Sequence, residues 1–373
     1  MIMKRALLFV SLLCLFVSAA AQAQRLPAAG DPAALREYAM KVLPRCSNGV
    51  VTLEPVEGGP VNFRAYVATV RSDDKYCGTQ KYLLYSPKTQ QILIGSVIPI
   101  ADDGRPIAVR LTDKTTELLG HKMKATVAPF PLQDGLKGVS ITRDTPYGTF
   151  TYSSFVDQSE KFLIVGFRGT LMTEPAKTLR DSLGVASGAR RGSGKVEILE
   201  LSDFQCPTCA NAHEKIEPFI QKNLGRMNYV RLDLPLFEHH EWSIPAAMGA
   251  RAIQKVAPTK YWQYVDYIFK NQETIGKRKF DEVIKEFAED HDIDWTAVNK
   301  IYSSKTESQA LLDQVSRAFA AGIASTPTFI VNGQIMGFGP EGAFTIDAIK
   351  SAVGAPVAAK AKPVAAKAKK AGK

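Results

Sequence analysis

The sequence predicts two folded domains, a β-rich (α+β) domain followed by an α/β domain. The 373 residues exceed the length of one average domain. Short β-branched and aromatic runs dominate the first half, whereas the second half contains a strand, a helix and another strand in succession. The stretch 186–194 between them is rich in Gly, Ser and Ala, which is typical of an interdomain linker.

The first 24 residues have the pattern of a secretory signal peptide. Lys4 and Arg5 precede an apolar run over residues 6–20, and small residues follow around Ala21 and Ala23. The run is about 15 residues long, shorter than the roughly 20 that cross a bilayer. We therefore expect cleavage near residues 22–25 and a periplasmic or secreted mature protein.

Residues 25–185 are predicted to form the β-rich domain. A helix is expected near Pro32–Val42. Two stretches, Tyr82–Ile98 and Tyr152–Thr170, resemble each other, but ordinary hairpins converge on the same pattern, so an internal repeat remains open. Strands are expected over Val50–Leu53, Val61–Val70, Lys81–Tyr85, Ile92–Ile98, Ile107–Leu111 and Lys161–Phe167.

Residues 195–354 are predicted to form the α/β domain. Its β-α-β unit consists of a strand over 196–201, a helix from Pro207 to Leu224 and a strand over 228–234. Helices are expected over 244–320. A hairpin around Asn332-Gly333, with strands at 328–331 and 334–338, and a last helix over 345–353 complete the domain.

The net charge of +10 lies mainly outside these domains. Lys4 and Arg5 carry two of the charges, and the low-complexity tail 355–373 carries six lysines. The folded part is nearly neutral, which argues against a nucleic-acid partner. The tail has nothing to bury and is expected to be disordered, with attachment to an anionic surface as the alternative.

The chemistry of the sequence centres on Cys206-Pro207-Thr208-Cys209. Cys206 falls between the end of a strand and the start of a helix, where unpaired N–H groups favour a thiolate, so it is expected to be the nucleophile. Pro207 suits the first helical position. Cys209, one turn further on, is expected to be buried and to resolve a mixed disulfide.

Two neighbouring residues leave alternatives open. His213 could join Cys206 and Cys209 as a zinc ligand, but no fourth ligand can be named, so no metal is predicted. Glu200 lies six residues before Cys206 on an otherwise apolar strand. It could be a buried carboxyl that relays a proton to or from Cys209, or a strand-end glutamate that faces solvent.

The other cysteines favour a structural disulfide. Cys14 lies within the signal segment, which leaves Cys46 and Cys77 as a second pair in a chain expected to enter an oxidising compartment. Closing this loop would stabilise the fold by roughly 3–4 kcal/mol in the entropy model. Neither cysteine has a partner at Cys-x-x-Cys spacing, so a second redox pair is the weaker alternative.

Two segments resemble the DsbA family of thioredoxin-fold oxidoreductases. The run from Glu200 to Cys209, Glu-Leu-Ser-Asp-Phe-Gln-Cys-Pro-Thr-Cys, is similar to the active-site segment of that family. The run from Gly322 to Gly333 is similar to its cis-proline segment. The resemblance covers about 195–353. It implies an α/β thioredoxin fold with a helical insertion, preceded here by a separate β-rich domain without a counterpart in minimal members.

The resemblance also implies residue roles. Cys206 would attack, Cys209 would resolve and Glu200 would occupy the buried-acid position. Pro327 would follow a cis peptide bond, so that the backbone of Thr326 could pair with an extended substrate beside the dithiol. His240 falls where relatives carry a histidine, with a structural role favoured.

The residues between the cysteines leave the reaction direction open. Pro207 and Thr208 would border the substrate and tune the thiolate, and Thr208 replaces the histidine of the best-known members. We expect an exported thiol-disulfide oxidoreductase without a cofactor beyond the Cys206–Cys209 disulfide. Its partners would be reduced or unfolded client proteins and a protein that recycles the dithiol. Isomerisation, or a non-catalytic client- or metal-binding module, is the alternative. By analogy with two-domain isomerases, the first domain could form a homodimer or hold clients.

Overall fold

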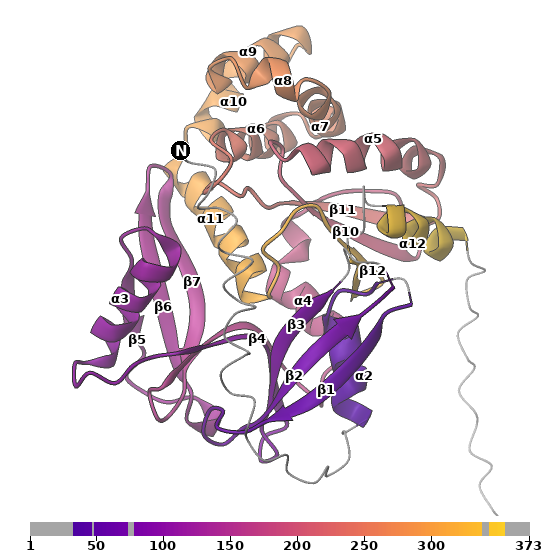
Figure 1. Cartoon of the computed structure of the whole chain (residues 1–373). Coiled ribbons are helices and arrows are strands. Elements are labelled where there is room, and N and C mark those ends of the chain that lie inside the picture. The colour runs from indigo at the N-terminus through magenta and orange to yellow at the C-terminus, as the bar shows by residue number, and fades with distance from the viewer. Residues whose placement is uncertain (1–32, 47, 74–77, 338–342, 355–373) are drawn as a thin grey trace, which may run out of the picture. The chain divides into compact units, whose positions relative to one another are not determined.

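The structure is a computed structural model, and it describes residues 33–46, 48–73, 78–337 and 343–354 (Figure 1). The chain divides into two compact units. Among the described residues, the first unit comprises 33–44, 48–73, 78–179 and 316–322, and the second comprises 45–46, 180–315, 323–337 and 343–354. Each unit contains one β-sheet, as predicted from the distribution of strand-like runs.

The first unit is built on an eight-stranded antiparallel sheet in the order β1-β2-β3-β4-β8-β7-β6-β5. Strands predicted around residues 50, 65, 83, 95 and 165 are all present. The strands are β1 (Val50–Val56), β2 (Arg64–Arg71), β3 (Thr79–Tyr85), β4 (Gln91–Pro99), β5 (Lys124–Val127), β6 (Lys137–Thr145), β7 (Gly148–Val156) and β8 (Phe162–Thr170). The helices are α2 (Ala33–Val42), α3 (Ile107–Leu119) and the start of α4 (Pro175–Leu183).

The predicted strand at Ile107–Leu111 is wrong, because this segment begins helix α3. Pro106 precedes the first turn, where its missing N–H is not needed. Leu111 and Thr115 are buried one turn apart, which is the helical period rather than the strand period. Gly120 ends the helix at φ 70° and donates its N–H to the Thr116 carbonyl.

Two similar meanders make up the sheet. Helix α2 precedes β1 to β4, and helix α3 precedes β5 to β8. Strand β8 begins and ends 71 residues after β4 begins and ends, from 91 to 162 and from 99 to 170. The two strands pair antiparallel with Gly95 opposite Gly166, which are separated by the same interval, so a local two-fold axis passes through this pair. The structure therefore supports the internal repeat.

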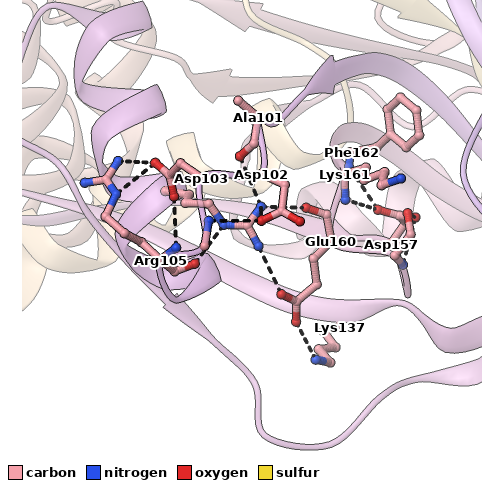
Figure 2. Close-up of polar contacts among 12 residues, drawn as sticks. Ala101, Asp102, Asp103, Arg105, Lys137, Asp157, Glu160, Lys161 and Phe162 are labelled. Atoms are coloured by element: carbon pink, nitrogen blue, oxygen red, sulfur yellow. Dashed lines mark hydrogen bonds and ion pairs between the residues drawn. The ribbon is translucent and has the colours of Figure 1, made fainter.

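The connection between the meanders is fixed by a buried arginine. Arg110 in α3 donates to the carbonyls of Ala101 and Arg105 at 3.1 and 3.0 Å and pairs with the Glu160 carboxylate at 3.2 Å. Lys137 also binds Glu160, at 2.9 Å (Figure 2). These contacts join the start of α3 to the turn before β8.

Apolar clusters cover both faces of this sheet. One contains Leu163 with Leu111 of α3, and the other contains Ile164 with Leu93. Because Leu163 and Ile164 are consecutive in a strand, they point to opposite faces. The sheet is thus stabilised by two separate cores.

The second unit is built on a five-stranded sheet in the order β13-β12-β10-β11-β9. Strands β10 and β11 are parallel and flank helix α5 in the chain, which gives the predicted β-α-β unit. The strands are β9 (Ala189–Arg191), β10 (Val196–Ser202), β11 (Met227–Asp233), β12 (Thr328–Val331) and β13 (Gln334–Ile335). The helices are α5 (Pro207–Lys222), α6 (Ser243–Val256), α7 (Tyr261–Lys270), α8 (Gln272–Ile275), α9 (Phe280–Asp290), α10 (Trp295–Tyr302), α11 (Lys305–Ala320) and α12 (Ala343–Gly354).

One face of this sheet packs against α5 and α12. Ile198 of β10 and Tyr229 of β11 share a cluster with Ile216 of α5 and Ile349 of α12. Alternation along β10 places Glu200 and Ser202 on the same face as Ile198. Helices α6 to α11 lie between β11 and β12, as predicted for residues 244–320 (Figure 1).

The structure differs from the predicted linker at 186–194. Residues Ala189–Arg191 form β9, which pairs antiparallel with β11 and therefore belongs to the second sheet. The division between the units lies at Leu179 and Arg180, within α4. Small residues permit the strand as readily as a flexible connection, so composition alone could not distinguish them. The predicted signal segment and tail lie outside the described residues.

Candidate active site

Cys206 is the residue that precedes the first turn of α5. It has extended backbone angles, φ −72° and ψ 120°, and Pro207 occupies the first turn. The Cys206 carbonyl accepts the N–H groups of Cys209 and Ala210 at 3.1 and 3.2 Å. The helix therefore begins at the nucleophile predicted from the sequence, and its positive end favours negative charge on that sulfur.

The two sulfurs of the motif have opposite properties. A hydrogen bond from the Cys209 thiol is the main cause that lowers the pKa of Cys206 to about 5, and the Thr208 hydroxyl at 2.9 Å contributes, whereas burial opposes both. Cys209 is completely buried, and burial raises the pKa of its thiol well above the usual value. At neutral pH the pair can therefore hold one thiolate and one thiol.

The cis-proline segment lies directly beside Cys206. The Thr326–Pro327 peptide bond is cis, as the resemblance implied. The Thr326 carbonyl oxygen lies 3.6 Å from the Cys206 sulfur and 3.4 Å from the Thr208 hydroxyl. Pro207 and Thr208 are exposed, whereas Pro327 is buried. The residues expected to border a substrate are thus brought to one place.

Glu200 is buried, with 2% of its surface exposed, so the solvent-facing alternative is wrong. The Tyr229 hydroxyl donates to its carboxylate. In the parallel register of β10 and β11, Glu200 lies opposite Arg231. Ser202, two residues nearer the motif on the same face, is also buried, and it partly offsets the burial that raises the pKa of Cys209. Glu200 of β10 is thus tied to β11 through Tyr229. Its role as a proton relay stays a prediction.

Arg231 forms the centre of a buried polar cluster below the active-site loop. It pairs with Asp233, and its Nη1 donates to the Tyr261 hydroxyl at 3.3 Å. Its guanidinium carbon lies 4.0 Å from the centre of the Phe204 ring. Its Nε and Nη2 atoms have no hydrogen-bond partner among the described residues. Sequence analysis missed this cluster because strand alternation gives no sign that an arginine points inwards.

The active-site loop is also bound by the helical insertion. The Gln272 side chain of α8 donates to the carbonyls of Phe204 and Cys206 at 2.7 and 3.1 Å. The Gln205 side chain accepts the N–H of Trp242 at 2.7 Å. These pairs are far apart in the sequence, and no local motif could have indicated them.

Asp203 links the same loop to His240. Its carboxylate accepts the N–H groups of Gln205 and Leu236 at 2.8 and 2.7 Å and bonds to His240 Nδ1 at 2.7 Å. Its carbonyl accepts the Cys206 N–H at 3.2 Å. An aspartate three residues before Cys206 is visible in the sequence, but its pairing with His240 is not.

His213 does not join the sulfurs as a metal ligand. It bonds to Asp266 at 2.6 Å, and these two residues gather with Glu217 as potential ligands. Glu217 is already engaged by both terminal nitrogens of Arg191. A guanidinium in contact with Glu217 disfavours a second cation there.

The predicted structural disulfide is only partly within the described residues. Cys46 is disulfide-bonded, whereas Cys206 and Cys209 are free thiols. Cys77 lies outside the described residues, so its pairing with Cys46 stays a prediction.

A family model described as Thioredoxin matches residues 190–355. With the sheet order and the Cys-x-x-Cys helix, this match shows that the second unit is a thioredoxin-like domain. The β-rich unit is a separate part of the chain.

Two curated antiporters share a sequence match with this chain. The Na(+)/H(+) antiporter NhaA 1 of Salinispora arenicola is 26% identical over 202 residues, which is 50% of this chain and 29% of that protein. NhaA 3 of Salinispora tropica is 25% identical over 202 residues, which is again 50% of this chain and 29% of that protein. The match therefore spans less than a third of either antiporter. In the described part of the chain, no helix combines the length and apolar character needed to cross a membrane.

Solved structures similar to this chain include BdbD from Bacillus subtilis, with 17% identity, a TM-score of 0.38, and coverage of 46% of this chain and 95% of that one. The thiol-disulfide exchange protein alpha-DsbA2 from Wolbachia pipientis has 18% identity, a TM-score of 0.41, and coverage of 48% and 92%. A thioredoxin-like oxidoreductase from Silicibacter pomeroyi has 21% identity, a TM-score of 0.38, and coverage of 48% and 99%.

Proposed function

We propose that this protein is an exported thiol-disulfide oxidoreductase that forms disulfides in client proteins. The observation that carries the proposal is the contrast between the sulfurs of one motif, Cys206 with a pKa of about 5 and Cys209 with a strongly raised pKa. The N-terminal pattern of residues 1–24 supports export. DsbA-like enzymes are the class that this combination of fold and motif favours.

The proposed oxidation proceeds through a mixed disulfide. A client thiolate attacks Cys206 Sγ, the Cys206–Cys209 bond breaks, and Cys209 leaves and takes up a proton. A second client thiolate then attacks the client sulfur, the mixed disulfide breaks, and Cys206 leaves as a thiolate. Two electrons pass from the client to the enzyme dithiol, which a disulfide-bearing or quinone-linked partner would reoxidise.

The low pKa of Cys206 favours this direction. A thiol of low pKa is a better leaving group, so the second attack is fast. Stabilising the thiolate also stabilises the dithiol form, which makes the disulfide more oxidising. The Thr326 backbone beside Cys206 would align an extended client peptide for both attacks.

The decisive experiment combines trapping with a redox titration of the mature full chain. Cys209→Ser should accumulate a client mixed disulfide, and the double variant that also carries Cys206→Ser should trap nothing. The dithiol should equilibrate near about −120 mV, the oxidising end of the scale, whereas a value near about −180 mV would favour isomerisation. Absence of both an equilibrating disulfide and a trapped client would leave a client- or metal-binding module as the better account.

A further inference from the structure

Asp203 has a buried carboxylate that makes three hydrogen-bond contacts. Its side chain is fully buried, and its two oxygens accept two backbone N–H groups and contact His240 Nδ1. A buried carboxylate is costly unless it is hydrogen-bonded and paired with a positive group. The His240 imidazole, with 21% of its side chain exposed, is the ionisable group that the structure places against it.

The His240 ring is held firmly in place. Its backbone N–H donates to the Leu236 carbonyl at 3.1 Å, and its own carbonyl accepts the Ser243 hydroxyl at 2.8 Å. The Asp203 contact fixes Nδ1, and no hydrogen bond of Nε2 is found among the described residues. The ring therefore has a fixed position relative to the loop that carries Cys206.

Two negative groups act on this imidazole. The Asp203 hydrogen bond is the main cause that raises the pKa of His240, burial opposes it, and the charge of Cys206 raises it further. On its own loop, His240 is flanked by Glu238, His239 and Glu241, which are not among these causes. Asp203 also links the ring to the nucleophile, because its carboxylate lies 2.7 Å from His240 Nδ1 while its carbonyl accepts the Cys206 N–H at 3.2 Å.

We propose that His240, held by Asp203, is an electrostatic positioning residue whose imidazolium stabilises the Cys206 thiolate and takes up a proton when the disulfide is reduced. This inference rests on the proposed function, because it concerns the same dithiol. Thr208 between the cysteines carries no charge, so the positive charge in this proposal comes from His240 on a different loop.

The proton and electron balance follows from linkage. In the disulfide form Cys206 carries no charge, so His240 faces Asp203 alone. When a client dithiol gives up two electrons and two protons, Cys209 takes one proton and becomes a thiol, Cys206 becomes a thiolate, and the remaining proton goes to His240. Because coupling between two sites is reciprocal, His240 must bind its proton more tightly in the dithiol form.

The first test is an NMR pH titration of the His240 ring in the mature full chain, once as the dithiol and once as the disulfide. The expected result is a higher His240 pKa in the dithiol form than in the disulfide form. Equal His240 pKa values in the two forms would overturn the proposal. A purely structural histidine would give that equality, so the readout separates the two roles.

The second test measures Cys206 alkylation by iodoacetamide against pH in His240→Gln and, as matched control, His239→Gln. Loss of the imidazolium should slow alkylation at pH 5 by about three- to tenfold with little change at pH 8, because one pKa unit corresponds to a tenfold change in protonation. Unchanged alkylation in folded His240→Gln would refute the charge role. A parent protein that traps no client would instead refute the proposed function, whatever the alkylation shows.

Discussion

The two units use buried polar side chains in different ways. In the β-rich unit, the carboxylate of Asp157 is fully buried and accepts the N–H groups of Ser159, Lys161 and Phe162 (Figure 2). In the thioredoxin-like unit, Arg231 pairs with Asp233, and two of its nitrogens have no hydrogen-bond partner in the described part of the chain. Asp157 thus fixes a turn of the first unit, whereas Arg231 lies in a buried polar cluster below the loop that carries Cys206.

This difference predicts what a mutation of a buried polar residue will change in each unit. A buried polar group that bonds to its own turn contributes to stability and to little else. A buried group near a dithiol also sets the charge that the sulfurs experience. The three tryptophans of the chain, Trp242, Trp262 and Trp295, all lie in the second unit, so tryptophan fluorescence follows that unit while circular dichroism follows both.

The largest effect is expected for Arg231→Met. Removing the guanidinium leaves Asp233 buried without its main cation, and breaking a buried ion pair typically costs about 3–5 kcal/mol. Urea unfolding followed by tryptophan fluorescence should show this loss. The exposed Arg226→Met is the control and should change the free energy of unfolding by less than about 0.5 kcal/mol. An equally small loss for Arg231→Met would show that the cluster is not essential to the second unit.

A smaller loss, confined to the other unit, is expected for Asp157→Ala. Three backbone N–H groups lose their acceptor in the turn before β8. Leaving such groups unsatisfied should cost about 2–4 kcal/mol. The transition seen by circular dichroism in the β-sheet region should move to lower urea, while the tryptophan transition and Cys206 alkylation stay unchanged. A parallel shift of both transitions would break the contrast between the units.

The axis of the internal repeat is the next point to test, through Gly166→Ala. Gly166 has φ 147°, and a Cβ there would lie 2.3 Å from the Ile94 carbonyl oxygen across the β4–β8 pair. Such strain should cost about 1–3 kcal/mol in the first unit. Gly78→Ala is the matched control, because an added Cβ there meets none of the described residues within 4 Å. Equal stability of the two variants, measured by circular dichroism in urea, would contradict the close approach of the two strands.

How much the sequence predicts also differs between the units. In the second unit the order of strand, dithiol helix, strand and cis-proline hairpin follows from local motifs around Cys206 and Pro327. In the first unit, the pairing of β4 with β8 joins segments 71 residues apart, from 91 to 162, and no local pattern specifies it. Residues 107–111 have a strand-like composition but begin helix α3, because a short apolar run alone does not fix the period.

The site shows the same limit. Cys206 and Cys209 could be assigned from their position at a strand-to-helix junction, since the helix start and its electrostatics are local properties. The contacts of Asp203 with His240 and of Gln272 with Cys206 depend on where the helical insertion folds back. Tertiary packing determines these contacts, so they become visible only in the structure.

The smallest effect is expected for Thr208→Val, which tests the pKa of Cys206 directly. The Thr208 hydroxyl lies 2.9 Å from the Cys206 sulfur and lowers its pKa, but the bond from Cys209 contributes more and remains. Because the Cys206 pKa is about 5, the parent thiolate forms as the pH rises through 5 and is complete at neutral pH. Loss of the hydroxyl should raise this pKa and reduce the alkylation rate at pH 5 by roughly two- to fivefold, with no change at pH 8. Stability of the disulfide form should not change, since the disulfide has no thiolate to stabilise. An alkylation profile identical to that of the parent would show that the Thr208 hydroxyl does not contribute to the low pKa of Cys206.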